Sequence, residues 1–187
     1  MAAKVSASEG LGWTIRIASM ADRAELEELI QQSARGLSRE EYTDGQIEAA
    51  IATVFGVDSD LIADGTYFVV EADGRLAGCG GWSKRKTLFG GDRYGDRESG
   101  WLDPATERAK IRAFFIHPDF ARRGIARTLL ARCEAEARAA KFTGLELMST
   151  LPGLKLYRAY GFEESEPTEY RTADGEILLL VPMFKNF

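Results

Sequence analysis

The chain has 187 residues, of which 45% are hydrophobic and 28% are charged, and 24 Lys and Arg against 29 Asp and Glu give a formal net charge of -5. A chain of this length and apolar content forms a buried core of ordinary size, which excludes an intrinsically disordered protein. The negative charge balance argues against a protein held mainly by nucleic-acid phosphates, so we expect no nucleic-acid partner.

Cysteine usage and hydropathy indicate the compartment. Cys79 and Cys133 lie in apolar segments without the spacing of a zinc motif or a disulfide framework, so we expect two buried free thiols and no metal site. The N-terminus has no signal-peptide core, and no apolar run is long enough to cross a membrane. We therefore expect a cytoplasmic protein without a membrane partner, built as a single domain over residues 1–187 with a flexible N-terminus at 1–12.

The predicted elements begin with a strand and two helices. Residues 13–18 alternate apolar and polar side chains, which is typical of a half-buried strand. Ser19 with Asp22, and Thr43 with Gln46, have capping-box spacing, and an amphipathic helical pattern follows each pair. The sequence therefore predicts two helices after the first strand.

A β-hairpin is predicted next, because Asp73-Gly74 lies between the apolar runs 66–72 and 75–83. The second run contains three glycines, which are typical of a bulged or closely packed strand. These glycines are Gly78, Gly80 and Gly81.

Residues 84–108 mix glycines with charges of both signs, and we expect a long loop that is functional or mobile. The remaining predicted elements are a strand at 109–116, a helix at about 124–140, a strand at 144–149, a short helix at about 153–160, and strands at about 162–170 and 176–184. This order predicts an α/β fold with a mixed, mostly antiparallel central sheet of about seven strands flanked by about four helices.

Residues 117–130 (HPDFARRGIARTLL) carry the clearest chemical signal, between an apolar strand and an amphipathic helix. The first turn of a helix has spare backbone N–H groups and the positive end of the helix dipole, which attract an anion. Arg122, Arg123 and Arg127 add charge-assisted donors, so a diphosphate fits this turn. The same arginines are also compatible with solvated surface charges near a helix start, and spacing alone leaves both interpretations open.

This segment resembles the acetyl-CoA-binding motif of the GNAT family of N-acetyltransferases, V-x-P-x-x-Q/R-x-x-G-x-G/A. Ile116, Pro118, Gly124 and Ala126 match the motif. Ala121 stands where the family prefers Gln or Arg, which removes a side-chain contact and leaves the backbone amides in place.

A second segment, residues 154–164 (LKLYRAYGFEE), is similar to the family signature A-x-x-L-Y-x-x-x-G-F. The order and spacing of the predicted elements agree with the family from about residue 13 to 184. The resemblance therefore implies the acyl-CoA N-acyltransferase fold, with acetyl-CoA as the cosubstrate.

The resemblance also implies which residues bind the cosubstrate. A strand offers main-chain groups to the pantetheine arm, a helix turn wraps the diphosphate, and a side chain seven residues before the signature tyrosine contacts pantetheine. The strand residues are Phe114, Phe115 and Ile116, and the side chain before the tyrosine is Thr150, where the family often has Asn. The residues of the helix turn are Arg122, Arg123, Gly124, Ile125, Ala126 and Arg127. The strands at 109–116 and 144–149 splay apart in this family, so that the thioester enters between them.

Two residues are the candidates for catalysis. Tyr157 takes the place of the family's frequent general acid, since a phenol with a pKa of about 10 can protonate a leaving thiolate. Without the resemblance, a core aromatic in a short helix is an equal interpretation. Glu146 is the nearest carboxylate to serve as base, but side chains alternate faces along a strand, and a water relayed by main-chain carbonyls is the alternative.

We therefore expect an N-acetyltransferase that moves the acetyl group of acetyl-CoA to a primary amine by direct attack in a ternary complex, the acceptor being a small molecule or a peptide. The alternative is a CoA-binding regulatory or interaction module with the same fold and no turnover. Four aromatic residues either line the acceptor site or anchor the long loop, namely Trp82, Phe89, Tyr94 and Trp101. The apolar run 177–184 is a candidate for strand pairing across a homodimer.

Overall fold

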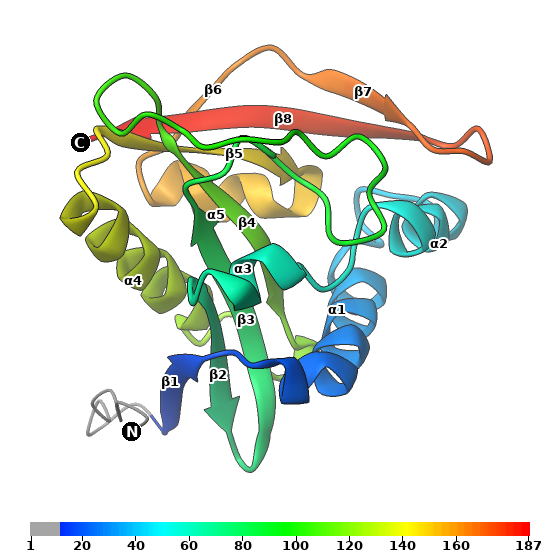
Figure 1. Cartoon of the computed structure of the whole chain (residues 1–187). Coiled ribbons are helices and arrows are strands. Elements are labelled where there is room, and N and C mark those ends of the chain that lie inside the picture. The colour runs from blue at the N-terminus through cyan, green and yellow to red at the C-terminus, as the bar shows by residue number, and fades with distance from the viewer. Residues whose placement is uncertain (1–11) are drawn as a thin grey trace.

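The computed structural model describes residues 12–187, so the expected flexible N-terminus at 1–12 lies outside the described residues apart from Gly12. The helices of this range are α1 (Arg23–Leu37), α2 (Asp44–Thr53), α3 (Ser59–Ala63), α4 (Ile125–Ala139) and α5 (Leu154–Ala159), as Figure 1 shows. The strands are β1 (Trp13–Ile17), β2 (Tyr67–Ala72), β3 (Arg75–Ser83), β4 (Ala109–Ile116), β5 (Gly144–Thr150), β6 (Glu163–Glu164), β7 (Thr168–Arg171) and β8 (Ile177–Asn186).

The eight strands form one sheet in the order β1-β2-β3-β4-β5-β8-β6, and β7 also pairs with β8. Within the described residues, β4 and β5 are parallel and every other strand pair is antiparallel. The predicted α/β fold with a mixed, mostly antiparallel sheet is therefore confirmed.

The structure differs from the predicted elements at two places. The short helix α3 was not expected, and it begins where the Asp58 carboxylate accepts a hydrogen bond from the Leu61 amide at 3.3 Å. The strand predicted at 162–170 is divided into β6 and β7, which both pair with β8. Pro167 lies in the interruption, where the missing N–H of proline cannot contribute to a ladder.

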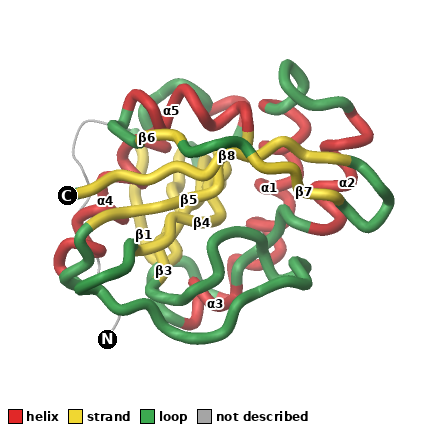
Figure 2. The backbone as a smooth tube through the Cα atoms, turned by 90° about the horizontal axis from the view of Figure 1, so that it is seen from above, coloured by secondary structure: helices red, strands yellow, loops and turns green. Residues whose placement is uncertain are grey.

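Helices cover both faces of the sheet, as the view in Figure 2 makes visible for α5 and α3. On one face α4 buries Leu129, Leu130 and Cys133 against β2 to β5, which confirms its predicted apolar stripe. On the other face α1 and α3 pack through Leu26 and Leu61 against β2 and β3. A further cluster joins α2 to β8, so each helix is held by apolar burial rather than by helix propensity alone.

The parallel pair of β4 with β5 is very short. Its register contains only Ala109 with Leu145 and Lys110 with Glu146, after which the two strands have no further pairing. The strands therefore diverge toward the C-terminal end of β4, as the family resemblance implied, and this divergence opens the sheet.

The final strand β8 has neighbours on both of its edges, β5 on one and β6 with β7 on the other. β5 pairs with β8 only from Leu180 onward, so the described strand pairs cover Ile177–Leu179 on the β7 side alone, and pairing of the run 177–184 across a homodimer stays a prediction. Within residues 12–187, no helix has the length and apolar character needed to span a bilayer.

The glycines of β3 allow close packing, as the sequence indicated. A Cβ on Gly80 would lie 2.6 Å from the Phe114 ring, and one on Gly81 would lie 2.7 Å from the Thr66 carbonyl oxygen. The register between β3 and β4 also shifts between Cys79 and Gly81, which is a β-bulge. A side chain at Gly81 would have to displace backbone.

We predict that Gly81→Ala lowers the unfolding free energy by about 1 to 3 kcal/mol, because the added methyl group overpacks against a backbone carbonyl. Gly95→Ala is the matched control, since a Cβ there meets nothing within 4 Å, and its change should stay within about 0.5 kcal/mol. Urea unfolding followed by circular dichroism measures both variants. Equal midpoints for the two variants would contradict the close approach of β3 and Thr66.

The segment before α1 is fixed by a carboxylate with several donors. Arg16 donates to the two oxygens of Asp22 at 2.9 and 2.7 Å, and the Ser19 amide donates to the same carboxylate at 2.7 Å. The Arg16 hydrogen bonds are the main reason why the pKa of Asp22 falls to about 2. The predicted capping box of Ser19 and Asp22 is confirmed.

Because the folded state lowers the pKa of Asp22, this carboxylate stabilises the fold above its unfolded value near 3.8, and the stabilisation is lost as pH falls toward 2. We predict that Asp22→Asn costs about 1 to 2 kcal/mol at pH 7, a figure reduced for the partial exposure of Arg16. The difference from the unsubstituted protein should shrink between pH 4 and about 2 in urea titrations. A difference that stays constant down to pH 2 would be inconsistent with this ion pair.

Candidate functional site

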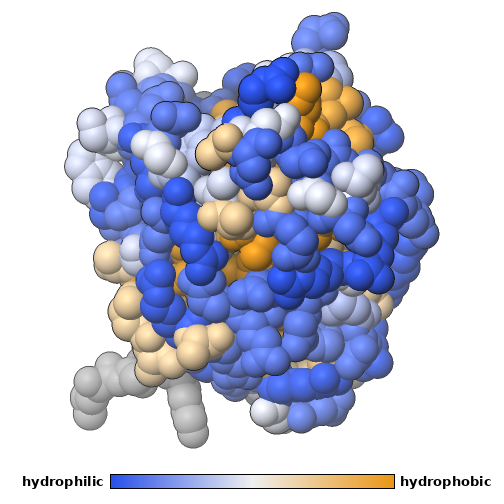
Figure 3. All heavy atoms as spheres, turned by 90° about the vertical axis from the view of Figure 1, so that its right-hand side faces the viewer, coloured by the Kyte–Doolittle hydropathy of each residue, from blue (hydrophilic) through white to orange (hydrophobic). Residues whose placement is uncertain are grey.

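A cavity of about 570 Å³ lies where β4 and β5 diverge. One end is bounded by the N-terminus of α4, and the other by the ends of α1 and α2 together with residues 89–91 of the long loop. From the side of α1 and α2, apolar atoms lie in a recess bordered by hydrophilic side chains (Figure 3). The volume is in the range of small-molecule sites.

The N-terminus of α4 has a backbone geometry that favours an anion. Gly124 is its N-cap with φ of 89°, and Arg122 before it has φ of 62°, a left-handed conformation that a non-glycine side chain rarely adopts. The amides of Ile125 and Ala126 belong to the first helical turn and have no partner within the helix. A Cβ at Gly124 would meet nothing within 4 Å, so open space lies directly in front of this turn.

The structure brings two of the three predicted arginines to the cavity. Arg122 and Arg127 line it, together with Gly124, Ile125 and Ala126. The Arg123 guanidinium instead lies over the Phe120 ring at 5.0 Å, and Arg123 is not among the lining residues. The two arginines that flank the α4 turn therefore contribute cationic groups at this end, and Lys155 of α5 is a further cationic residue that lines the cavity.

The predicted main-chain segment of β4 forms one wall. Phe114, Phe115 and Ile116 line the cavity, just after Ala113, which has φ of 56°. Gly80 faces this irregular stretch, since the register passes from Cys79 opposite Phe115 to Gly81 opposite Arg112. The bulge changes the direction of the β4 amides and carbonyls next to the opening of the sheet.

Tyr157 and Thr150 lie on the opposite wall. Tyr157 is 8% exposed, its ring lies against Phe162 in an edge-on contact with centroids 5.7 Å apart, and a Cβ on Gly153 would reach within 3.0 Å of it. Burial raises the pKa of the Tyr157 phenol above its usual value, so the hydroxyl stays protonated at neutral pH.

Glu146 is placed differently from Tyr157. It lies on β5, forms an ion pair and hydrogen bond with Lys110 of β4, and is not among the residues that line the cavity. None of the described lining residues is Asp, Glu or His. The role of Glu146 as a base therefore stays a prediction without support from its placement.

For the end of the cavity at α1, α2 and residues 89–91, the sequence suggested only aromatic residues in and next to the long loop as lining residues. Phe89 lines the cavity, whereas Tyr94 packs against Phe89 at 4.7 Å between centroids. Trp82 is buried and donates to Glu136 at 3.0 Å, and Trp101 is 56% exposed on the surface. Phe89 therefore belongs to the wall, and Tyr94 and Trp82 have anchoring roles.

Further residues at this end were missed by the sequence analysis. They come from separate elements, and only an arginine within an otherwise apolar strand could have drawn attention to one of them. They are Val54, Phe55, Met148, Leu180 and Arg112. Together with Phe89 they form what we term the distal chamber.

The cavity thus combines a site for an anion, a wall of exposed main-chain groups, a protonated phenol and an apolar chamber. An elongated molecule with a charged end and a reactive opposite end fits this sequence of environments. The chemistry supported is group transfer at the point where the chamber, Tyr157 and β4 meet.

Solved structures of acetyltransferases share this fold. A GCN5-related N-acetyltransferase from Rhodopseudomonas palustris has 17% identity and a TM-score of 0.70, covering 93% of this chain and 95% of that one. The PaiA N-acetyltransferase from Thermoplasma acidophilum, in complex with coenzyme A, has 17% identity and a TM-score of 0.62, covering 94% and 99%. A ribosomal-protein-alanine N-acetyltransferase from Brucella melitensis has 21% identity and a TM-score of 0.61, covering 93% and 99%.

No curated protein matches the chain significantly in sequence. The family comparison is decisive, because residues 24–162 match the Acetyltransferase (GNAT) family and this match contains both the α4 turn and Tyr157. The resemblance predicted from the two motifs is therefore confirmed, and the chain belongs to the GNAT family of acetyltransferases, whose cosubstrate is acetyl-CoA.

Proposed function

We propose that this chain is a single-domain, cytoplasmic N-acetyltransferase that moves the acetyl group of acetyl-CoA to a primary amine by direct attack in a ternary complex. The observation that carries the proposal is the continuous cavity that joins the α4 N-terminus to the distal chamber through the opening between β4 and β5. The two cysteines are buried free thiols, which suits a reducing compartment.

The residues present fit acetyl-CoA. The amides after Gly124, with Arg122 and Arg127, offer donors to the diphosphate, and the open space at Gly124 admits it. Main-chain groups of Phe114 to Ile116 are available to the amides of the pantetheine arm, because amides require hydrogen-bond partners when buried. This arrangement would bring the thioester to the opening of the sheet.

The amine must be neutral before it attacks. A lysine-like amine with a pKa of about 10.4 pays roughly 4.6 kcal/mol to lose its proton at pH 7. The apolar distal chamber favours the neutral form, since burial lowers the pKa of an amine. The proton then leaves through water held by main-chain carbonyls, or reaches Glu146 if β4 and β5 move.

Transfer follows from the position of Tyr157. The amine nitrogen bonds to the thioester carbonyl carbon, and the carbon–sulfur bond then breaks as the thiolate leaves. The Tyr157 hydroxyl, which is protonated at neutral pH, donates its proton to that sulfur. The nitrogen, positively charged after it has bonded, releases one proton to water, and the phenolate recovers a proton from water, so that free coenzyme A and the neutral acetylated amine are the products.

Binding of the diphosphate is tested with a matched pair of glycine substitutions. Gly124→Ala and Gly74→Ala both place a methyl group at a positive φ, of 89° and 75°, where no atom lies within 4 Å. Both substitutions should cost about 1 to 2 kcal/mol of stability through backbone strain. Only Gly124→Ala should weaken acetyl-CoA binding in titration calorimetry, by about tenfold or more, since only that methyl group projects toward the diphosphate. Equal affinities for the two variants would argue against this phosphate site.

The acid is tested by Tyr157→Phe, with Tyr160→Phe as the control. Loss of the Tyr157 hydroxyl should lower kcat by about 100-fold with little change in acetyl-CoA affinity, whereas Tyr160→Phe should keep kcat within a few-fold. Thiol release with a panel of amines measures both. If acetyl-CoA binds tightly and the unsubstituted protein acetylates no amine, the chain is instead a CoA-binding module without turnover.

A further inference from the structure

The distal chamber is apolar on most of its surface. Its aromatic walls are Phe55, which meets the Phe115 ring edge-on at 5.5 Å between centroids, and Phe89, which contacts the rings of Tyr94 and Tyr170 at 4.7 and 5.9 Å. Val54 and Leu180 are buried beside them. A ligand group that enters this space exchanges water for aromatic and aliphatic contacts.

The charge in the chamber has one sign. Arg112 is its one charged member among the described lining residues at this end, and no described lining residue of the whole cavity is acidic. The Arg112 side chain is 1% exposed and lies 2.5 Å from the Asp58 carboxylate, which is itself 0% exposed. A second ammonium group on an acceptor would therefore lose its water without gaining a carboxylate partner.

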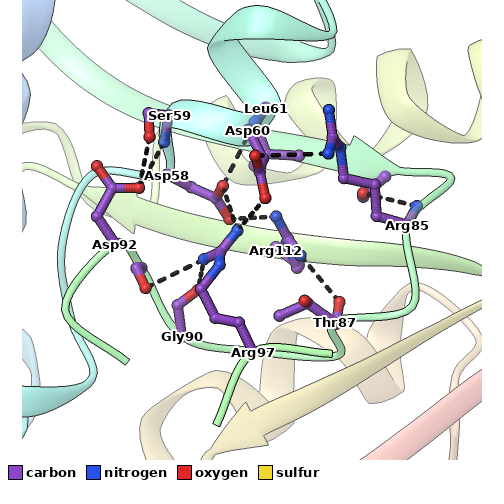
Figure 4. A network of polar contacts seen from close by, with 12 residues as sticks. Asp58, Ser59, Asp60, Leu61, Arg85, Thr87, Gly90, Asp92, Arg97 and Arg112 are labelled. Carbon is purple, nitrogen blue, oxygen red and sulfur yellow. Dashed lines mark hydrogen bonds and ion pairs between the residues drawn. The ribbon is translucent and has the colours of Figure 1, made fainter. Parts of the chain in front are cut away.

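The aromatic wall is held in place from behind by a partly buried polar network, which Figure 4 shows. Arg112 donates to the Thr87 carbonyl at 2.9 Å, and Arg97 donates to the Gly90 and Gly91 carbonyls at 3.1 Å each. These bonds fix the main chain on both sides of Phe89. Arg97 also reaches two carboxylates at the start of α3, at 3.2 and 2.6 Å, namely Asp58 and Asp60.

We infer that the acceptor is a primary amine whose body is apolar, with an aromatic or alkyl group that fills the distal chamber, and that carries no second positive charge. This inference rests on the proposed function. The apolar walls and the fixed position of Phe89 supply the affinity, and the lack of a carboxylate among the described lining residues disfavours diamines and polyamines. Acceptor selection is thus a property of the chamber and independent of the diphosphate site.

The test compares amines that differ only in the second charge. Hexylamine and 1,6-diaminohexane have the same chain length, and 2-phenylethylamine and spermidine extend the pair toward aromatic and polycationic acceptors. With saturating acetyl-CoA, the kcat/KM values for hexylamine and 2-phenylethylamine should exceed those for 1,6-diaminohexane and spermidine by at least about tenfold. A polyamine preference, or equal values, overturns the inference and leaves the N-acetyltransferase function intact.

A substitution in the chamber tests the location. Met148 is half-buried on β5 and lines the chamber, so Met148→Glu places a carboxylate there, and Met148→Gln has the same length without the charge. The glutamate variant should shift the diamine-to-monoamine ratio of kcat/KM by about tenfold or more toward the diamine, and the glutamine variant should not.

The possible results have distinguishable consequences for the inference. If both Met148 variants keep the original ratio, the acceptor does not occupy the distal chamber. If the glutamate variant fails to fold, the amine comparison on the unsubstituted protein still decides. If acetyl-CoA binds by calorimetry and none of the four amines is acetylated, this inference falls, and the proposed function falls with it only if the wider panel of small-molecule and peptide amines is also not acetylated.

Discussion

The divergence of β4 and β5 is the constraint on which the rest of the molecule depends. β4 and β5 are paired at only two positions, and this short pairing leaves an opening near the middle of the sheet. Helices on both faces keep the strands apart, since α4 with α5 and α1 with α3 bury apolar side chains on opposite sides. A cavity can therefore pass through the sheet without leaving its core exposed.

Local backbone geometry matches two parts of that opening to different chemistry. At one end, Gly124 and Arg122 adopt positive φ angles so that the first amides of α4 face open space. In the middle, Ala113 has φ of 56° and the β4 main chain turns next to the opening. These irregular positions lie on the cavity and not in the packed core, which is where strained backbone is functionally useful.

The sequence predicted the parts of the site that are local. The α4 turn is contained in a short segment, so Gly124 and its arginines could be identified without knowing the fold. The stacking of Arg123 on Phe120 depends on tertiary structure, so the sequence could not show that this arginine lies outside the cavity lining. The helix α3 has five residues, too few for a periodic pattern. The face of Glu146 could not be determined from alternation alone, since it needed the pairing with Lys110. The distal chamber is assembled from α2, the long loop, β4, β5 and β8, and no single segment encodes it.

The place of β8 in the sheet has a consequence for biosynthesis. This strand follows β5, β6 and β7 in sequence and yet lies between them in space. During translation β5 therefore emerges before its antiparallel neighbour, and its unpaired edge is available to other chains in the interval. Chaperone capture of the nascent protein would be most useful in that interval, and completion of the sheet by β8 would end it.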